Sequence, residues 1–349
     1  MKRKNLALAA LGLAVAALLS GCTTPTATSG PPAELHLGYF ANVTHAPALV
    51  GIEKGFFQDA LGDTKLKTSV FNAGPATIEA LSAGAIDAAY IGPSPAINTY
   101  IKSGGASAVI VSGATSGGAA LVVRDGINSP SDLPGTTLAT PQLGNTQDIA
   151  LRAWLADQGY TTSTTGGGDV TISPTDNADT LSLFQDGKLD GAWLPEPWVS
   201  RLVLEGHAHV LVNEASLWPK SKFPTTVLLV NKDFLAAHPD TVKALVQGNV
   251  DAVDWLNDNP ADAGTVINKR ITADTGKGLS NDVIARALEN VQFSVDPQAA
   301  AFPVLVKHAA AVDLGTDGSI DGLFDLRFLN EILSASGAHP ISTHGLGKE

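Results

Sequence analysis

The chain of 349 residues contains one cysteine, Cys22, and it lies near the N-terminus. A single cysteine cannot close a disulfide within the chain, so no disulfide framework supports the fold. The pair His207 and His209 has no matching cysteine cluster and no HExxH segment elsewhere, so a solvated turn explains it better than a metal site. We therefore expect no metal and no cofactor.

Charged residues are also scarce. They make up 16% of the chain, which argues against long disordered or coiled-coil regions. The formal net charge is −12, and the lysines and arginines form no basic stripe, so nucleic acid is excluded as a partner. If the ligand is an anion, local hydrogen-bond donors must attract it against the field of an acidic protein.

No apolar run is long enough for a confident membrane span. Residues Leu6 to Leu19 are apolar, follow the basic segment Lys2 to Lys4 and precede "LSGC", which ends at Cys22. This order is typical of a signal peptide, here residues 1–22, and the last four residues resemble the bacterial lipobox. We predict cleavage before Cys22 and thioether lipidation of its sulfur. A chance cysteine in an ordinary signal peptide is the alternative.

The next segment, 23–33, reads "TTPTATSGPPA" and is polar and broken by proline and glycine. Such a composition predicts a flexible tether. Together these segments predict an exported monomer, anchored by its lipid to the outer face of the cell membrane, on the periplasmic or extracellular side.

Two stretches of the chain repeat one another. Residues 76–96, "ATIEALSAGAIDAAYIGPSPA", align with residues 179–199, "DTLSLFQDGKLDGAWLPEPWV", and each predicts a helix, a glycine cap, a short strand and a proline turn into another helix. The same offset of 103 residues brings Asn42 onto Asn145, each between a strand and a helix. One unit used twice predicts two similar lobes.

Short apolar runs alternate with helical periodicity along most of the chain. This βαβ alternation predicts an α/β fold of two Rossmann-like lobes with mainly parallel sheets. The apolar runs 120–124 and 225–230 flank the second unit, so we expect the chain to cross between the lobes there. The predicted limits are residues 34–120 with 224–349 for lobe 1 and residues 121–223 for lobe 2, with the ligand in the cleft between them.

Ligands of open α/β sheets lie at the carboxyl ends of strands, where helices begin. The stretch "LGYFANVTHAPALV" places polar side chains at such a junction, and helix N-termini hold anions through free N–H groups. The same rule gives five groups of candidate ligand-binding residues: Asn42, Thr44 and His45; Pro93 and Ser94; Thr115, Ser116 and Gly117; Gln142, Asn145 and Thr146; Trp193 and Glu196.

Two other interpretations compete with ligand binding at these positions. Asn, Ser and Thr are favoured as helix caps for stability alone. Ser94 in "IGPSPA" stands at a strand-turn-helix, the context of a hydrolase nucleophile, but the pattern requires a glycine where Ala96 stands, and Pro93 and Pro95 restrict the sharp turn. We therefore expect no catalytic residues and no enzyme activity.

The segments "GYFANVTHAPALVGIEKGFF", "GATSGGAALVVR", "LATPQLGNTQDIALRAWL" and "DGAWLPEPWVSRLV" resemble the substrate-binding lipoproteins of ABC importers in the aliphatic sulfonate, taurine and nitrate family. The resemblance covers Leu35 to about Leu333. It implies the type II periplasmic-binding-protein fold, capture of a small organic anion or zwitterion, and delivery to an ABC permease with its ATPase.

The resemblance leaves alternatives within the binding class. Nitrate or bicarbonate is one, and a thiamine-precursor-like heterocycle, sandwiched by Tyr39, Trp193 and Trp198, is another. An anchored serine hydrolase remains a remote alternative outside that class.

Glu196 is the only acid among the candidates, and an acid repels an anion. Three accounts are open for it. Glu196 stabilises the start of its own helix, or it pairs with a cation such as Arg152 or Arg201, or it receives the ammonium of a zwitterion such as taurine.

Overall fold

The computed structural model describes residues 31–315 and 318–349. The predicted signal peptide, the lipobox with Cys22 and most of the tether lie outside the described residues. Residues from Pro31 onward form one compact unit that contains both sheets. None of the described helices is long and apolar enough to cross a membrane.

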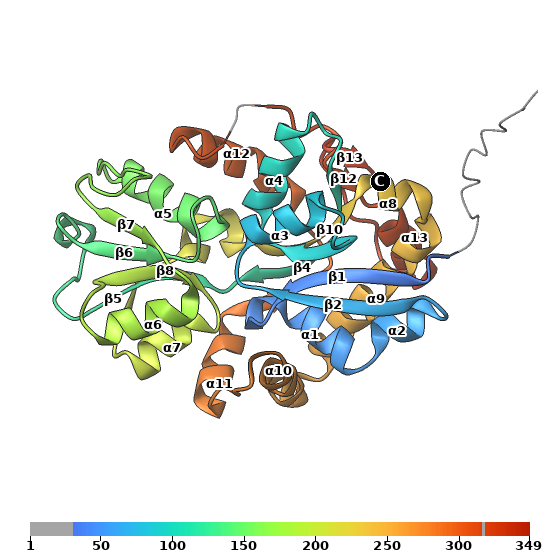
Figure 1. Cartoon of the computed structure of the whole chain (residues 1–349), viewed down its shortest axis with the longest axis horizontal. Helices are drawn as coiled ribbons and strands as arrows, with labels where there is room; N and C mark the ends of the chain where they lie inside the picture. The colour runs from blue at the N-terminus through green and yellow to red at the C-terminus, as the bar shows by residue number, and fades with distance from the viewer. Residues whose placement is uncertain (1–30, 316–317) are drawn as a thin grey trace, which may run out of the picture. The chain divides into compact units, whose positions relative to one another are not determined.

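The strands form two sheets, shown side by side in Figure 1. The larger has eight strands in the order β13-β12-β4-β10-β3-β1-β2, with β11 also paired to β4, and the smaller has the order β7-β6-β8-β5-β9. The strands are β1 Glu34–Phe40, β2 Lys65–Phe71, β3 Ala88–Ile91, β4 Ala108–Gly117, β5 Ala119–Val123, β6 Thr137–Thr140, β7 Thr171–Pro174, β8 Gly191–Pro195, β9 His209–Asn213, β10 Pro224–Asn231, β11 Val291–Phe293, β12 Phe324–Asp325 and β13 Gly347–Lys348.

Helices follow most of the strands, which confirms the α/β class. They are α1 Ala46–Glu53, α2 Phe56–Leu61, α3 Gly74–Ser82, α4 Pro93–Lys102, α5 Thr146–Asp157, α6 Asn177–Gln185, α7 Trp198–Glu205, α8 Lys232–Ala237, α9 Pro239–Asp258, α10 Pro260–Thr275, α11 Asn281–Glu289, α12 Phe302–Ala311 and α13 Arg327–Ala335. Short 3₁₀ turns are η1 Val43–His45, η2 Pro130–Asp132, η3 Glu214–Leu217, η4 Pro219–Ser221 and η5 Ala299–Ala301.

The two sheets share one strand order. The five strands β2-β1-β3-β10-β4 of the larger sheet correspond to β7-β6-β8-β5-β9 of the smaller one. In each set the first three strands are parallel and the fourth is antiparallel to both neighbours. The repeated segments form α3, β3 and α4 in one part and α6, β8 and α7 in the other. This agreement supports the sequence repeat.

We call the larger sheet with its helices lobe 1, and the smaller sheet with α5, α6 and α7 lobe 2. The chain enters lobe 2 from β4 to β5 through Gly118 and returns from β9 to β10. Buried side chains fill both faces of the smaller sheet, with α6 and α7 over one cluster and α5 over the other (Figure 1). The residue limits given for the two lobes from the sequence remain a prediction.

A buried carboxylate lies between β8 and η3 of lobe 2. Glu214 is 2% exposed, and its Oε2 accepts a 2.7 Å hydrogen bond from the indole Nε1 of Trp193. Burial raises the pKa of Glu214 to about 7, and the hydrogen bonds from Trp193 and Trp218 oppose part of that rise. The carboxyl therefore binds a proton more tightly in the folded protein than in the unfolded chain.

This shift predicts that Glu214 makes the fold less stable as the pH rises. The contribution is complete below the unfolded pKa of about 4.5 and is lost as pH rises through about 7, by up to about 3 kcal/mol. Glu214→Gln, which keeps an acceptor for Trp193, should flatten this part of the profile. Denaturant unfolding from pH 4.5 to 8 measures it, with the exposed Glu289→Gln as control. Parallel profiles for wild type and Glu214→Gln would contradict the prediction.

Candidate functional site

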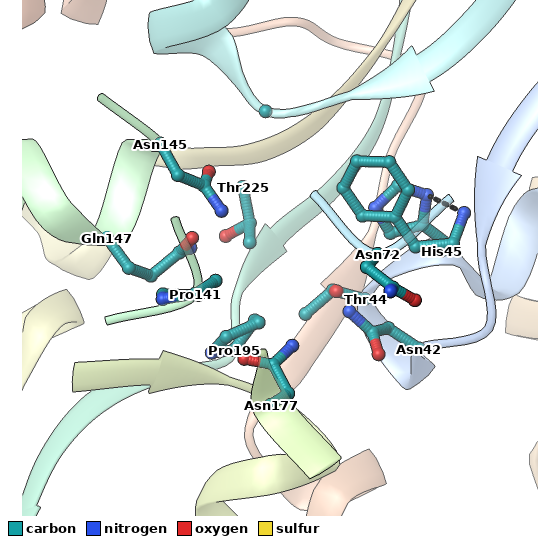
Figure 2. Close-up of a pocket in the computed structure, with 12 residues that line it drawn as sticks. Asn42, Thr44, His45, Asn72, Pro141, Asn145, Gln147, Asn177, Pro195 and Thr225 are labelled. Atoms are coloured by element: carbon teal, nitrogen blue, oxygen red, sulfur yellow. Dashed lines mark hydrogen bonds between the residues drawn. The ribbon is translucent and has the colours of Figure 1, made fainter. Parts of the chain in front are cut away.

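A cavity with about 300 Å³ of empty volume, counting the space open to solvent, lies between the two lobes. Figure 2 shows its side chains, with Asn145 and Gln147 on one side and Asn42, Thr44 and Asn72 on the other. We call it the inner chamber. Its lining comprises Phe40, Asn42, Thr44, His45, Asn72 and Gly92 from lobe 1, Pro141, Asn145, Gln147, Asn177 and Pro195 from lobe 2, and Thr225 at the start of β10.

Four helices begin at residues that line the inner chamber. His45, Gly92 and Asn145 are the N-caps of α1, α4 and α5, and Asn177 is the first residue of α6. The first turn of a helix has N–H groups without intrahelical partners and carries the positive end of the macrodipole. Two helices come from each lobe, so the chamber is a place where negative charge is stabilised from both sides.

The ring of His45 is a neutral donor. The side chain is 3% exposed, and burial lowers its pKa to about 3. Its Nδ1 accepts a 3.2 Å hydrogen bond from the Phe40 N–H, so in the neutral ring the proton is on Nε2. The Phe40 ring also stacks on it, with 4.2 Å between centroids. His45 can therefore donate one hydrogen bond to a ligand without carrying charge.

No Lys, Arg, Asp or Glu is among the residues that line the inner chamber in the described part of the chain. Its donors are the amides of Asn42, Asn72, Asn145, Gln147 and Asn177, with hydroxyls and the imidazole. Asn145 Oδ1 accepts from the Thr146 N–H at 2.5 Å, which leaves its Nδ2 for a ligand. Such a site suits a small oxyanion or a neutral polar group.

Side chains of lobe 2 reach lobe 1 around the chamber. The Trp198 indole Nε1 donates to Asn42 Oδ1 at 2.9 Å, and Asn72 Nδ2 donates to Asp176 Oδ2 at 3.3 Å. Because Asn42 accepts through its oxygen, its Nδ2 is left for the chamber. The Asn42 side chain, which lines the chamber from lobe 1, is thus also bonded to lobe 2.

Thr146 of lobe 2 contacts lobe 1 at Gly92 and Ser94. The Thr146 Oγ1 accepts a 3.3 Å hydrogen bond from the Ser94 N–H in the first turn of α4. A Cβ on Gly92 would lie 2.4 Å from this Oγ1, so any side chain there would separate the two groups. The backbone of Gly92 is in the ordinary extended region, and the need for glycine comes from the contact alone.

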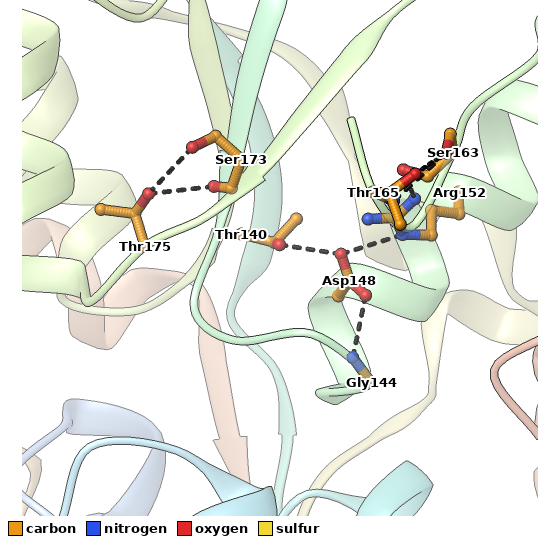
Figure 3. A network of polar contacts seen from close by, with 8 residues as sticks. All are labelled: Thr140, Gly144, Asp148, Arg152, Ser163, Thr165, Ser173 and Thr175. Atoms are coloured by element: carbon orange, nitrogen blue, oxygen red, sulfur yellow. Dashed lines mark hydrogen bonds and ion pairs between the residues drawn. The ribbon is translucent and has the colours of Figure 1, made fainter. Parts of the chain in front are cut away.

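An internal network of lobe 2 fixes the loop that carries Asn145 (Figure 3). Asp148 Oδ2 accepts from the Gly144 N–H at 2.9 Å, and its Oδ1 accepts from Thr140 Oγ1 at 2.9 Å and Arg152 Nε at 3.1 Å. Asp148 and Arg152 are 0% and 1% exposed, so each charge is compensated inside the lobe. The network supports the first turn of α5 from behind.

Of the predicted residues, four line the inner chamber: Asn42, Thr44, His45 and Asn145. Pro93, Ser94 and Thr146 form the contact between the lobes at α4 and are absent from the lining. Ser94 Oγ is buried and has no hydrogen-bond partner among the described residues. Gln142 is half-buried in the turn before Asn145 and accepts from its N–H through the backbone.

Thr115, Ser116 and Gly117 lie elsewhere than expected. The apolar run that begins at Ala108 predicts a strand that ends at Gly113, but β4 continues to Gly117, and these residues pair with β10 on one edge and with β11 on the other. Strand pairing uses their backbone groups, so they form part of the sheet and not a helix start. The physical reason is β11, a strand from far along the chain.

Trp193 is completely buried inside lobe 2, where its ring lies 5.9 Å from that of Trp154. Tyr39 is buried in lobe 1, and its hydroxyl donates to Asp274 Oδ2 at 2.9 Å. Of the three predicted sandwich residues, Trp198 lines a cavity bordered by α7 and α10, Trp193 lines a different cavity bordered by α5 and α12, and Tyr39 lines neither. The structure therefore does not bring together an aromatic sandwich for a heterocycle.

Glu196 is fully buried and holds lobe 2 to α11. Its Oε2 accepts from the Ser200 N–H at 3.0 Å, and its Oε1 accepts from Asn290 Nδ2 at 3.0 Å and Arg286 Nη1 at 3.3 Å. Burial raises its pKa, and the bonds from Ser200, Arg286 and Asn290 oppose the rise. The first two accounts of Glu196 both apply, except that the cation is Arg286. Arg152 and Arg201 pair with Asp148 and Glu205.

Four polar residues of the chamber are absent from the predicted set: Asn72, Gln147, Asn177 and Thr225. Asn72 and Asn177 follow β2 and β7 and precede α3 and α6, so the rule that found Asn42 applies to them as well. Gln147 lies two residues after Asn145 on the same helix turn. Thr225 gave no such signal, because it lies at the start of a strand and reaches the chamber through the crossing between lobes.

The two α/β lobes, the two crossings and the chamber between them define the type II periplasmic-binding-protein fold. The chain belongs to the NMT1-like family, whose model matches residues 28–270. Within the described residues, no three His, Cys, Asp or Glu side chains form a group that could hold a metal ion.

The comparisons with individual proteins agree with this family. A putative binding protein of Brucella abortus is 24% identical over 72% of this chain and 79% of its own length, and a putative aliphatic sulfonates-binding protein of Bacillus subtilis is 25% identical over 80% and 81%. The alkanesulfonate-binding protein SsuA of Xanthomonas axonopodis pv. citri, bound to MOPS, has a similar structure with a TM-score of 0.68, 22% identity and coverage of 82% and 96%. The structure of the nitrate-binding protein NrtA of Synechocystis is also similar, with a TM-score of 0.66 and 16% identity. The match covers 88% of this chain and 90% of NrtA.

The contact at Gly92 can be tested by a double-mutant cycle. Gly92→Ala should lower the free energy of unfolding by about 1–3 kcal/mol, because its methyl overlaps Thr146 Oγ1. In the Thr146→Ala background that oxygen is absent, so the second substitution should cost nothing further. Urea unfolding of all four proteins measures the coupling. Additive effects would show that the two residues do not restrain each other.

The role of Glu196 leads to a second prediction. Glu196→Gln should lower the free energy of unfolding by about 1–3 kcal/mol, because the amide presents a donor to Ser200 N–H or to Arg286. Glu205→Gln, in the more exposed pair with Arg201, should cost less than about 0.5 kcal/mol. Equal stability losses for the two variants would contradict the bridging role.

Proposed function

We propose that this protein is the extracytoplasmic substrate-binding component of an ABC importer and that it captures a small organic anion. The ligand that we expect is an aliphatic sulfonate. One observation carries the proposal. The chamber is surrounded by neutral donors and by the starts of four helices, two from each lobe. None of the described residues that line it is charged. A sulfonate offers three oxygens to such donors, and its charge is stabilised by the helix starts.

The names of the related proteins support the same function. They include a taurine-binding periplasmic protein of Escherichia coli, 28% identical over 54% of this chain and 57% of its own length, besides the sulfonate and nitrate binders. These names describe binding proteins, which supports a role without catalysis. We infer that the protein is exported, is anchored through Cys22, acts as a monomer and docks on a permease with its ATPase.

The hydrogen bonds of Glu196 bear on how the site would bind a zwitterion. Both carboxylate oxygens of Glu196 are bonded to Ser200, Arg286 and Asn290, so Glu196 is not free to receive an ammonium. We therefore expect an anion in the chamber to bind through its oxyanion group, without a contact between Glu196 and an ammonium. Nitrate and bicarbonate are smaller oxyanions that the same donors could hold.

Calorimetric titration with methanesulfonate, taurine, nitrate, bicarbonate and a thiamine-precursor pyrimidine tests the proposal. Asn145→Ala should weaken binding of the preferred anion about tenfold or more, the usual loss of a bond to a charged group. Asn231→Ala is the matched control, because Asn231 is the N-cap of α8 and lies outside the chamber. Its substitution removes a similar helix-capping hydrogen bond. Equal affinities of the two variants, or no binding by any oxyanion, would contradict the proposed function.

A further inference from the structure

The structure contains a second cavity that the proposed function does not use. It lies between α5 of lobe 2 and α12 of lobe 1, which pack against each other (Figure 1). Its empty volume is about 800 Å³, counting the space open to solvent, and it shares no lining residue with the inner chamber. We call it the tryptophan cavity, because its lining includes the indole rings of Trp154, Trp193 and Trp218.

Aromatic rings line the tryptophan cavity from both lobes. The ring centroid of Trp154 in α5 lies 5.9 Å from that of Trp193 in β8, and the centroid of Trp218 lies 5.9 Å from that of His308 in α12. The face of an indole ring is electron-rich and attracts a cation more strongly than the face of any other aromatic side chain. These rings therefore favour a cation over an anion.

A buried carboxylate in the same cavity has the same preference. Glu214 lines the cavity, and its Oε2 accepts the 2.7 Å hydrogen bond from Trp193 Nε1. No Lys or Arg is among the described residues that line the cavity, so Glu214 has no cationic partner there. An ionised carboxylate that is buried without a cation is costly, and a bound cation would remove much of that cost.

The other titratable side chains that line the cavity are His308 and Asp157, and neither replaces the missing cation. Burial lowers the pKa of His308, and Asp157 opposes only part of that change, so the imidazole is neutral near pH 7. Asp157 is the exposed last residue of α5 and adds a second carboxylate to the lining. The local field of the cavity therefore also favours positive charge.

We propose that the tryptophan cavity is a second ligand-binding site and that it takes a small organic ammonium ion. The methyl or methylene groups of such an ion pack against the indole rings, and its charge lies beside the Glu214 carboxylate. A quaternary ammonium suits the cavity best, because it donates no hydrogen bonds and the indole N–H groups are donors themselves. The site is separate from the inner chamber, so the inference does not rest on the identity of the imported anion.

Calorimetric titration with choline and with 3,3-dimethyl-1-butanol tests this site. The alcohol has the shape of choline but carries a carbon in place of the charged nitrogen, so choline should bind about tenfold tighter or more. Glu214→Gln should weaken choline binding about tenfold or more at pH 8, because the amide keeps an acceptor for Trp193 and loses the charge. Asp157→Asn is the control for net charge and should change the affinity about twofold at most, because Asp157 is exposed.

The pH dependence of choline binding provides a second readout. Burial raises the pKa of Glu214 to about 7, and choline binds the ionised carboxylate, so the affinity should rise about tenfold from pH 6 to pH 8. The rise should disappear in Glu214→Gln and persist in Asp157→Asn. A rise that persists in Glu214→Gln would assign the titration to His308 or Asp157 and would overturn the inference.

The variant Asn145→Ala separates the two sites. It should leave choline binding unchanged, and Glu214→Gln should leave methanesulfonate binding unchanged. Equal losses of choline affinity in Asn145→Ala and Glu214→Gln would place the cation in the inner chamber and overturn the inference. Equal losses in Asp157→Asn and Glu214→Gln, equal affinities for choline and the neutral alcohol, or no binding of choline would overturn it as well. If choline binds as expected and no oxyanion does, the proposed function fails alone.

Discussion

None of the described residues that line the inner chamber is cationic, and this constraint determines much of what surrounds it. Partial charges at helix starts act only over the first turn of each helix, so they must converge at short range. Each lobe supplies two of the four helix starts, because α1 and α4 begin on one side and α5 and α6 on the other. The contacts between the lobes, among them that of Thr146 with α4 across Gly92, bring both pairs to one chamber.

The repeated strand order explains how one short unit provides both halves. In each lobe a parallel strand ends at the cleft, and an asparagine caps the turn or helix that follows, Asn42 after β1 and Asn145 after β6. Both asparagines line the chamber. Facing sheets of the same topology present the carboxyl ends of their strands to one cleft, so the same local solution serves twice.

Local patterns predicted the parts of the site that depend on neighbouring residues. The helix, strand and helix of each repeated unit followed from the sequence pattern, and Asn42, His45 and Asn145 followed from their positions after strands. The failures involve partners distant in the chain. Thr115 lies in β4 because β11 pairs with it, and Glu196 is bonded to Arg286, ninety residues away. No pattern within a short segment encodes such a pairing.

The position of Glu196 also shows how an acidic protein can hold an anion. The net charge of the protein, −12, repels an anionic ligand at long range, although salt screens that field within about 8–10 Å. A buried carboxylate next to the cleft would be a worse obstacle, because a low dielectric strengthens repulsion. Arg286, Asn290 and the Ser200 N–H surround its two oxygens, so its charge is compensated where it lies. The same bonds join lobe 2 to α11, so the compensated carboxylate also holds the two lobes together.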